Sequence, residues 1–506
     1  MNVLKSKLIL DWLKGISPKP KVNKSQYPSK YLKSKKILFL EPRGAKANIF
    51  SNVMKYPLLG PLRMTTILRQ HGYNAIMYHE NLAKKDIPEK ILKSVDILIF
   101  SLLTQTAKRG YFLADQYKKY RPDGKVIIGG IHPSMNPNEG LPYCDYLCIG
   151  EGEEIILDLI EGKFKEKIVK TKRIDDLTKL LIPDLSVVVN NKRIKIAPIL
   201  TSLGCPFGCT FCCVTEMYGR KYRLFSIEQT IKAINQYLRK YVFFLDDNFC
   251  VDKKRALMLF SKIKELDHKF IWLAQVRADI ATDESFIKEM ALAGCRRVFI
   301  GFESVNQNSL NEIEKKTTLE VYKNAIKVFH NNGIPIHAMF ILGLDNDDNS
   351  VFEKTVKFCK DNAIESVQFL IITPLPGTSF FKNLDKNRLI NDDIDLYDGN
   401  HVIVEPKNMT ASQLFEGILW AYDKFYSWSS ILKQFLRDIQ NFHKENLRTK
   451  RYRIRKMFNN IYRSIGFRSI IKKLKKISRI YRTELEYYPA FQNKKPIENH
   501  LTKLIH

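Results

Sequence analysis

Short apolar runs alternate with windows of helical periodicity in the second half of the chain. Six runs rich in Ile, Val, Leu and Phe are short enough for strands, and amphipathic windows separate them. This alternation predicts parallel strands joined by helices. The expected strands are Ile199–Leu203, Val242–Asp246, Ile271–Val276, Arg297–Gly301, Ile336–Leu342 and Ser366–Ile372, and the clearest helices are Ile227–Leu238, Lys254–Leu266 and Glu284–Leu292.

The stretch from Lys36 to Glu154 carries the same alternation. Gly72 follows its first helical window as a stop signal. The pattern predicts a Rossmann-like, doubly wound parallel sheet, with ligands expected beyond the carboxyl ends of the strands. The expected strands are Ile37–Leu40, Asn74–Tyr78, Ile97–Ser101, Lys125–Ile128 and Asp145–Ile149, and the expected helices are Gly60–His71, Pro88–Ser94 and Lys108–Tyr120.

The loop after the first strand of the second stretch contains Cys205, Cys209 and Cys212 at a CxxxCxxC spacing. Three thiolates so spaced can reach three corners of one iron–sulfur cube and leave the fourth iron open, and soft thiolates suit such clusters. A structural zinc site would need a fourth Cys or His close by. Cys213 is adjacent to Cys212 but points elsewhere on a regular backbone. The other alternative is a chance group of buried thiols.

This cysteine loop resembles the cluster-binding motif of the radical S-adenosylmethionine (SAM) enzymes. The resemblance implies a partial (β/α)6 barrel and a 4Fe–4S cluster held by the three cysteines. It also implies that SAM binds the open iron and is cleaved reductively to a 5′-deoxyadenosyl radical. An electron donor of the flavodoxin or ferredoxin type would then be needed.

Polar residues follow the other expected strands, where parallel barrels gather their chemistry. By resemblance to the family, these residues are expected to bind SAM. They are Asp246 and Asp247 at the methionine amine, Arg277 at the carboxylate, Glu303 at a ribose hydroxyl or ammonium group, Phe211 near adenine, and Ser304 and Gly343 at neighbouring strand ends. The alternatives are that the aspartates cap helices and that Arg277 pairs with Asp279 at the surface.

Three loops of the first stretch look like those of the cobalamin-binding domain fused to many radical SAM methylases. The residues expected at cobalamin are Thr104, Thr106, Gly129, Gly130, His132, Gly150 and Glu151. Glycines let a backbone approach a bulky ligand. The Asp-x-His-x-x-Gly signature is absent, so no His of that motif would coordinate cobalt. The alternative is a domain that survives as scaffold after losing its cofactor.

These patterns divide the chain into five parts. They are a basic N-terminal segment (1–35), a cobalamin-binding-like domain (36–160), a linker (161–195), a radical SAM barrel (196–410) and a basic helical C-terminal region (411–506). The resemblance is greatest to a subgroup that includes hopanoid methylases and archaeal lipid-ring synthases. It implies cobalamin-dependent methylation of an unactivated carbon in a lipid or another apolar metabolite. Carbon–carbon coupling or cyclisation without methyl transfer is one alternative, and RNA modification is another.

The net charge of +30 is concentrated at the two ends of the chain. Between Arg448 and Arg482 there are fourteen Lys or Arg and no acidic residue. Apolar residues recur there at helical spacing, as they do at Leu4, Leu8, Trp12 and Leu13. Basic amphipathic helices favour peripheral contact with an anionic membrane surface, or they simply pack on their own protein.

The nine cysteines are scattered over 506 residues and no secretory signal precedes them. This excludes a disulfide scaffold and favours a reducing, cytoplasmic setting, with any membrane contact at the inner face. Nucleic acid is not favoured as a partner, because no RNA-recognition signature is present. Methylthiolating tRNA enzymes carry three cluster cysteines in their N-terminal domain, whereas this domain has only Cys144 and Cys148.

Overall fold

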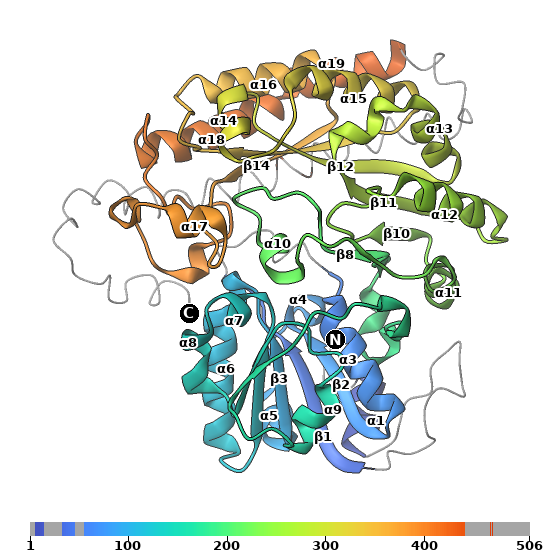
Figure 1. Cartoon of the computed structure of the whole chain (residues 1–506), viewed down its shortest axis with the longest axis vertical. Coiled ribbons are helices and arrows are strands. Elements are labelled where there is room, and N and C mark those ends of the chain that lie inside the picture. The colour runs from blue at the N-terminus through green and yellow to red at the C-terminus, as the bar shows by residue number, and fades with distance from the viewer. Residues whose placement is uncertain (1–5, 15–32, 46–54, 441–465, 467, 469–506) are drawn as a thin grey trace.

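The computed structural model describes residues 6–14, 33–45, 55–440, 466 and 468 of the chain. Two six-stranded parallel sheets lie one above the other along the long axis, with α10 (Cys213–Tyr218) between them (Figure 1). Each sheet carries its own helices. The two sheets correspond to the two stretches of alternating pattern in the sequence.

The first sheet has the strand order β2-β1-β3-β4-β5-β6, and the chain winds outward from β1 and β3. This confirms the predicted doubly wound α/β domain. Its strands are β1 (Lys33–Glu41), β2 (Tyr73–His79), β3 (Ile97–Ser101), β4 (Lys125–Gly129), β5 (Tyr146–Ile149) and β6 (Ile168–Lys170). Its helices are α3 (Leu59–Gln70), α4 (Glu80–Ala83), α5 (Glu89–Ser94), α6 (Ala107–Tyr120), α7 (Ile131–Met135), α8 (Pro137–Gly140) and α9 (Ile156–Glu161).

The second sheet has the order β14-β13-β12-β11-β10-β7, so consecutive strands are neighbours in a half-open barrel. Its strands are β7 (Ile196–Ile199), β10 (Tyr241–Phe244), β11 (Ile271–Val276), β12 (Cys295–Glu303), β13 (Ile336–Leu342) and β14 (Ser366–Ile371). Its helices are α11 (Ile227–Tyr237), α12 (Lys253–Glu265), α13 (Glu284–Leu292), α14 (Gln307–Glu312), α15 (Leu319–Asn331), α16 (Val351–Asp361), α17 (Ser379–Asn383), α18 (Ala411–Phe425) and α19 (Trp428–Gln440). The predicted partial barrel is confirmed.

The first barrel strand lies earlier than the sequence predicts. Instead of Ile199–Leu203, β7 ends at Ile199, and Ser202–Leu203 forms the short strand β8, antiparallel to β9 (Arg223–Leu224). The chain leaves the sheet because the amide and hydroxyl of Thr201 both donate to the carboxylate of Asp246. Pro198 is tolerated within β7 because that strand is an edge of the sheet.

The other edge of the barrel is covered by Tyr422 of α18 and by Tyr426, the residue that directly follows this helix. The Tyr422 hydroxyl donates to the carbonyl of Phe369 and accepts from its amide, at 3.0 and 2.9 Å. Tyr426 does the same with Val367, at 3.0 and 2.9 Å. The side chains thus take the place of a seventh strand along β14, which would otherwise present unpaired backbone groups.

The segments outside the predicted domains pack on the sheets. β6 lies within the expected linker and adds a sixth strand to the first sheet. After β14 the chain returns to the first domain, where Ile394, Leu396 and Ile403 join the core beside α6. An ion pair of 2.6 Å between Lys108 Nζ and Asp393 Oδ1 reinforces this contact.

The N-terminal apolar stripe is packed inside the protein. In α1 (Lys7–Leu13), Ile9 and Trp12 are fully buried, and Trp12 Nε1 donates to the carbonyl of Asn74 at 2.9 Å. The apolar side of α1 formed by Ile9 and Trp12 therefore packs on its own protein. The predicted C-terminal stripe lies outside the described residues. Within the described residues, no helix combines the length and apolarity needed to cross a bilayer.

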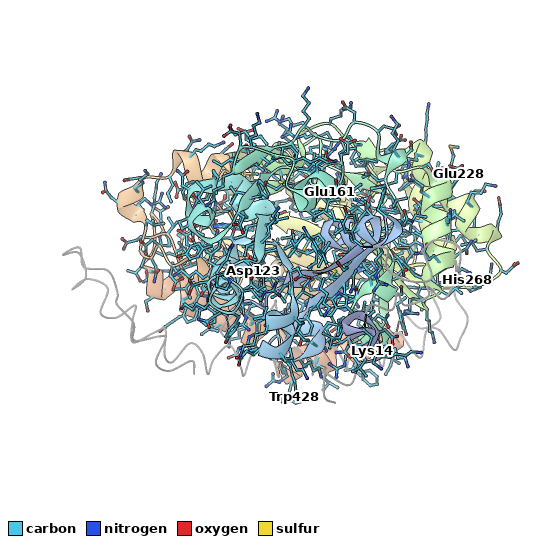
Figure 2. The ribbon with its side chains drawn as sticks, turned by 90° about the horizontal axis from the view of Figure 1, so that it is seen from below. Lys14, Asp123, Glu161, Glu228, His268 and Trp428 are labelled. Atoms are coloured by element: carbon cyan, nitrogen blue, oxygen red, sulfur yellow. The ribbon has the colours of Figure 1, made fainter. Side chains whose placement is uncertain are left out.

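The carboxyl-terminal edge of the first sheet faces the carboxyl-terminal edge of the barrel. α7, which follows β4, contacts α10, which follows the cysteine loop. Its Met135 also packs on Gly377, in the loop after β14. Figure 2 looks onto the opposite side of the first domain, with Asp123 in the α6–β4 connection and Glu161 at the end of α9. The carboxyl-terminal edges of both sheets, where parallel α/β folds place their ligands, therefore meet in the middle of the molecule.

Candidate active site

The three motif cysteines lie together in the loop between β8 and α10. All three are free thiols and half-buried. Burial raises the pKa of each of the three thiols. Cys209 raises the pKa of Cys205 further, and Cys213 does the same for Cys212. Three thiolates so placed would need a cation between them. Iron supplies that charge, so the soft donor set fits an iron–sulfur cluster.

The cysteine loop does not have the arrangement of a closed zinc site. In the part of the chain that the structure describes, no three His, Cys, Asp or Glu side chains converge so as to hold a single metal ion. Three cysteines spread along a loop fit a larger cluster with one iron left open.

Arg277, at the end of β11, braces the cysteine loop. Its guanidinium carbon lies 3.7 Å from the ring centroid of Phe207, which is a cation–π contact. Its Nη2 donates to the carbonyl of Lys315 at 2.9 Å, and its Nε donates to Asp279 at 3.1 Å. The Thr210 amide donates to Ile313 at 3.2 Å. The guanidinium thus ties the cysteine loop to the loop after α14.

Lys315 was not identified from the sequence. Its Nζ lies 2.7 Å from Glu303 Oε1, and both side chains are buried. Glu303 sits where the β12–β13 register shifts, with φ at 64°, and the residues on either side of Lys315 also have positive φ. Left-handed backbone at non-glycine residues is strained and is often found at functional sites. Lys315 and Arg277 both lower the pKa of Cys209, opposing the effect of burial.

The two aspartates after β10 differ sharply. Asp246 is fully buried and accepts hydrogen bonds from Thr201 and Ser202, so it holds the backbone at the start of the cysteine loop. Asp247 is exposed to solvent, yet the surrounding protein and Asp246 raise its pKa to about 7. It also acts electrostatically on Cys205 and Cys212. Of the two, Asp247 is the carboxyl group that a ligand can reach.

The other predicted SAM residues have packing roles in this arrangement. Ser304 is fully buried and accepts from the amide of Asn306 at 3.0 Å. Gly343 has φ at 89°, and a Cβ there would lie 2.5 Å from Leu414 of α18. Phe211 packs at the barrel rim against Ile341 and its neighbours. Each supports the site without presenting a free polar side chain.

The glycines and threonines predicted at cobalamin are largely engaged within the first domain. A Cβ at Gly130 would lie 2.4 Å from the Leu102 amide nitrogen, and one at Gly150 would lie 2.4 Å from Thr171 Oγ1. The Thr106 hydroxyl exchanges hydrogen bonds with Leu103. Thr104 is buried, whereas Gly129 is half-buried at the end of β4. The glycines therefore allow tight turns at the strand ends, which shape the ligand edge of the sheet.

His132 and Glu151 are also held inside the protein. The His132 side chain is fully buried, its Nε2 lies 3.1 Å from Glu139 Oε2, and its buried Nδ1 has no hydrogen-bond partner. Glu151 forms a buried two-armed ion pair with Arg223 of β9 and accepts from the Ile174 amide at 2.9 Å. Glu151 thus joins the two domains instead of presenting its carboxylate to a ligand.

Two family models match the chain. The B12 binding domain matches residues 58–160, and the Radical SAM superfamily matches residues 199–359. The first match covers the doubly wound sheet from α3 to α9. The second covers the barrel from β7 to α16, including the cysteine loop.

Curated relatives match most of the chain. The bacteriochlorophyllide d C-12(1)-methyltransferase of Chlorobaculum tepidum is 28% identical over 417 residues, which cover 79% of this chain and 89% of that protein. The anaerobic magnesium-protoporphyrin IX monomethyl ester cyclase of Rubrivivax gelatinosus is 26% identical and covers 79% of this chain and 78% of its own. The hopanoid C-2 methylase of Rhodopseudomonas palustris is 27% identical over 54% of each chain.

A solved structure shares the whole arrangement. The cobalamin-dependent S-adenosylmethionine radical enzyme OxsB, with aqua-cobalamin and S-adenosylmethionine bound, aligns over 93% of this chain and 83% of its own. Its TM-score is 0.63 at 15% sequence identity. The fold and the order of the two domains are therefore shared.

Proposed function

We propose that this chain, which belongs to the radical SAM superfamily and carries a B12 binding domain, methylates an unactivated carbon of an apolar small molecule. The single observation that carries the proposal is the meeting of the two ligand edges. The three-cysteine loop and the carboxyl-terminal edge of the B12 binding domain lie face to face, in contact through α7 and α10.

The cofactors of these domains are a 4Fe–4S cluster, SAM and cobalamin. When bound, the cluster supplies the electron for reductive cleavage of SAM, and cobalamin supplies the methyl group. The chain's own part is to bind and orient. Cys205, Cys209 and Cys212 would hold the cluster, and Asp247 would receive the SAM ammonium group. Arg277 and Lys315 would place positive charge beside the anionic cluster.

The experiment is an anaerobic incubation of the reconstituted enzyme with SAM that carries a trideuterated methyl group. The substrate source is a lipid and pigment extract of the cells in which the chain is made. We expect one product that gains a labelled methyl group, together with 5′-deoxyadenosine and S-adenosylhomocysteine. Protein that binds no corrinoid and transfers no label would contradict the proposal.

A second candidate is radical carbon–carbon coupling or cyclisation, with the B12 binding domain kept as scaffold. The observation that favours it is the 26% identity, over 79% of the chain, to a protein named as a cyclase. The same incubation separates the two candidates. Cyclisation gives 5′-deoxyadenosine without S-adenosylhomocysteine.

The setting we propose is the reducing cytoplasm, with a flavodoxin or ferredoxin as electron donor. All nine cysteines are free, as a reducing compartment requires. A lipid substrate, and contact of the basic C-terminal region with the inner face of a membrane, remain part of the proposal. They rest on the charge pattern and on the relationship to a hopanoid methylase.

A further inference from the structure

The outer face of α19 carries a row of apolar side chains that lie in solvent. The helix packs on the protein through Ile431, which is buried, and through Gln434 and Phe435, which are half-buried. Side chains three or four residues apart share one face of a helix, and here a second face is apolar. This α19 stripe consists of Trp428, Leu432, Leu436 and Ile439, with exposed fractions of 61, 58, 49 and 44%. Exposed apolar side chains usually stand singly, so such a row indicates a contact surface.

The α19 stripe lies far from the meeting point of the two domains. In Figure 1, α19 is at the outer end of the long axis, beside α16 and on the side of the barrel away from the first domain. Figure 2 places Trp428, the first residue of α19, at the edge of the molecule. The stripe is therefore separate from the candidate active site.

Basic side chains flank the α19 stripe. Lys433, which is exposed, and Arg437, which is half-buried, lie on α19 itself, and Asp438 is the one acidic residue in the sequence of this helix. Burial lowers the pKa of Lys360 of α16, and the charges of Lys424 and Lys433 lower it further. Lysines from three helices therefore gather at this end of the protein. The outer face of α19 is apolar along one side and basic along the other.

Two contacts between a cation and a tryptophan occur at the same end of the protein. The guanidinium carbon of Arg468 lies 4.9 Å from the ring centroid of Trp428, and its Nη1 donates to the carbonyl of Tyr426 at 2.6 Å. Lys424 Nζ lies 5.7 Å from the ring centroid of Trp420, which is also exposed. Tryptophan rings and basic side chains are favoured where a bilayer meets water.

The charge of this face decides between three candidate occupants. The C-terminal region of the chain has fourteen Lys or Arg and no acidic residue between Arg448 and Arg482, so packing it on the stripe would bring like charges together. A second copy would bring an identical basic face. An anionic lipid surface instead offers acidic headgroups to the lysines and apolar acyl chains to the stripe. Charge complementarity therefore favours lipid.

We propose that the outer face of α19 docks on an anionic membrane surface, with the helix parallel to the membrane plane and the α19 stripe inserted among the lipids. This inference rests on the proposed function, because the membrane would hold the apolar substrate proposed there. Lys424, Lys433 and Arg468 meet the acidic headgroups. The contact is peripheral, since no helix of the described residues has the length and apolarity needed to cross a bilayer.

The test is flotation of the anaerobic, full-length holoenzyme with two kinds of vesicle, phosphatidylcholine alone and equal parts of phosphatidylcholine and phosphatidylglycerol. We expect binding to the anionic vesicles to be at least about tenfold tighter, because each basic side chain at the surface contributes. Leu432→Ser combined with Leu436→Ser should weaken this binding about tenfold, because two apolar side chains no longer enter the lipid. Lys433→Gln should weaken it about fivefold.

The matched controls change exposed side chains on helices of another face. Leu257→Ser combined with Leu292→Ser removes exposed leucines of α12 and α13, and Lys288→Gln removes an exposed lysine of α13. Both control proteins should bind the anionic vesicles as the parent does. Quenching of tryptophan fluorescence by brominated lipids, reduced in Trp428→Phe, tests the insertion directly and serves if a serine variant folds poorly.

Equal binding to the two kinds of vesicle would overturn the inference. A Leu432→Ser/Leu436→Ser protein that binds like its leucine control would do the same. A parent that is dimeric by light scattering, and becomes monomeric in this variant, would assign the stripe to a second copy instead. Corrinoid content and 5′-deoxyadenosine formation are measured on the same preparations. Failure of the proposed function is therefore seen separately from failure of vesicle binding.

Discussion

The buried ion pair between Glu151 and Arg223 predicts strong coupling between the two domains. The exposed fractions of the two side chains are 4% and 2%, and Arg223 also donates to the carbonyl of Ile174. Removing one partner leaves the other as an uncompensated buried charge. Arg223→Met should therefore lower the free energy of unfolding by about 3–5 kcal/mol. Combining Arg223→Met with Glu151→Leu should recover much of that loss, because a buried pair replaced by apolar side chains is nearly neutral.

The assay is equilibrium urea unfolding followed by circular dichroism, with corrinoid content measured on each variant. The matched control is Lys163→Met, which breaks exposed pairs of 2.8 Å with Asp158 and 3.0 Å with Glu161 and should change stability little, because exposed pairs are screened by solvent. If Arg223→Met is as mild as the control, the pair does not join the domains. If Glu151→Gln loses corrinoid while keeping its stability, Glu151 contacts cobalamin and its role is not to join the domains.

Three further predictions concern the site and its supports. Lys315→Met should lower the midpoint potential of the cluster in an EPR-monitored redox titration, because a positive charge near Cys209 is lost. Lys316→Met, which changes the exposed neighbour, should leave the potential unchanged. Equal effects of the two substitutions would refute a specific role of Lys315. Cys212→Ala should reduce bound iron and sulfide in an anaerobic reconstitution, whereas Cys213→Ala should not, and loss in both would contradict the three-cysteine assignment. Burial raises the pKa of Glu41 from 4.5 to about 8, so its contribution to stability is complete below pH 4.5 and is lost as the pH rises to 8. Between pH 6.5 and 8, the urea midpoint of the Glu41→Gln variant should consequently fall less than that of the parent protein. This window lies above the pKa range in which the neighbouring His79 titrates. Parallel pH profiles of the two proteins would contradict the role of Glu41.

The fold could be predicted from the sequence because, in both domains, short apolar runs alternate with amphipathic windows and mark the strands and helices directly. Ile97–Ser101, Ile271–Val276 and Ile336–Leu342 are strands with the predicted bounds, since a buried parallel strand is a continuous apolar run between turn signals. The shift of the first barrel strand could not be predicted. It depends on hydrogen bonds from Thr201 to Asp246, 45 residues away.

The cysteine loop could be predicted because spacing along the chain determines which corners of a cluster the thiols reach. The roles of single polar residues could not, because they depend on partners distant in sequence. Glu151 pairs with Arg223, 72 residues away, and Glu303 pairs with Lys315 across a strained loop.

The most direct test of the account is the magnetic interaction between its two metal centres. Enzyme purified anaerobically with its corrinoid, reduced so that the cluster and the cobalt are both paramagnetic, is measured by EPR spectroscopy. The account predicts that the cluster broadens the cobalt spectrum and speeds its relaxation, and that Cys212→Ala, which lacks the cluster, gives the unperturbed cobalt signal. A cobalt signal that is the same with and without the cluster would contradict the claim that the two ligand edges form one active site.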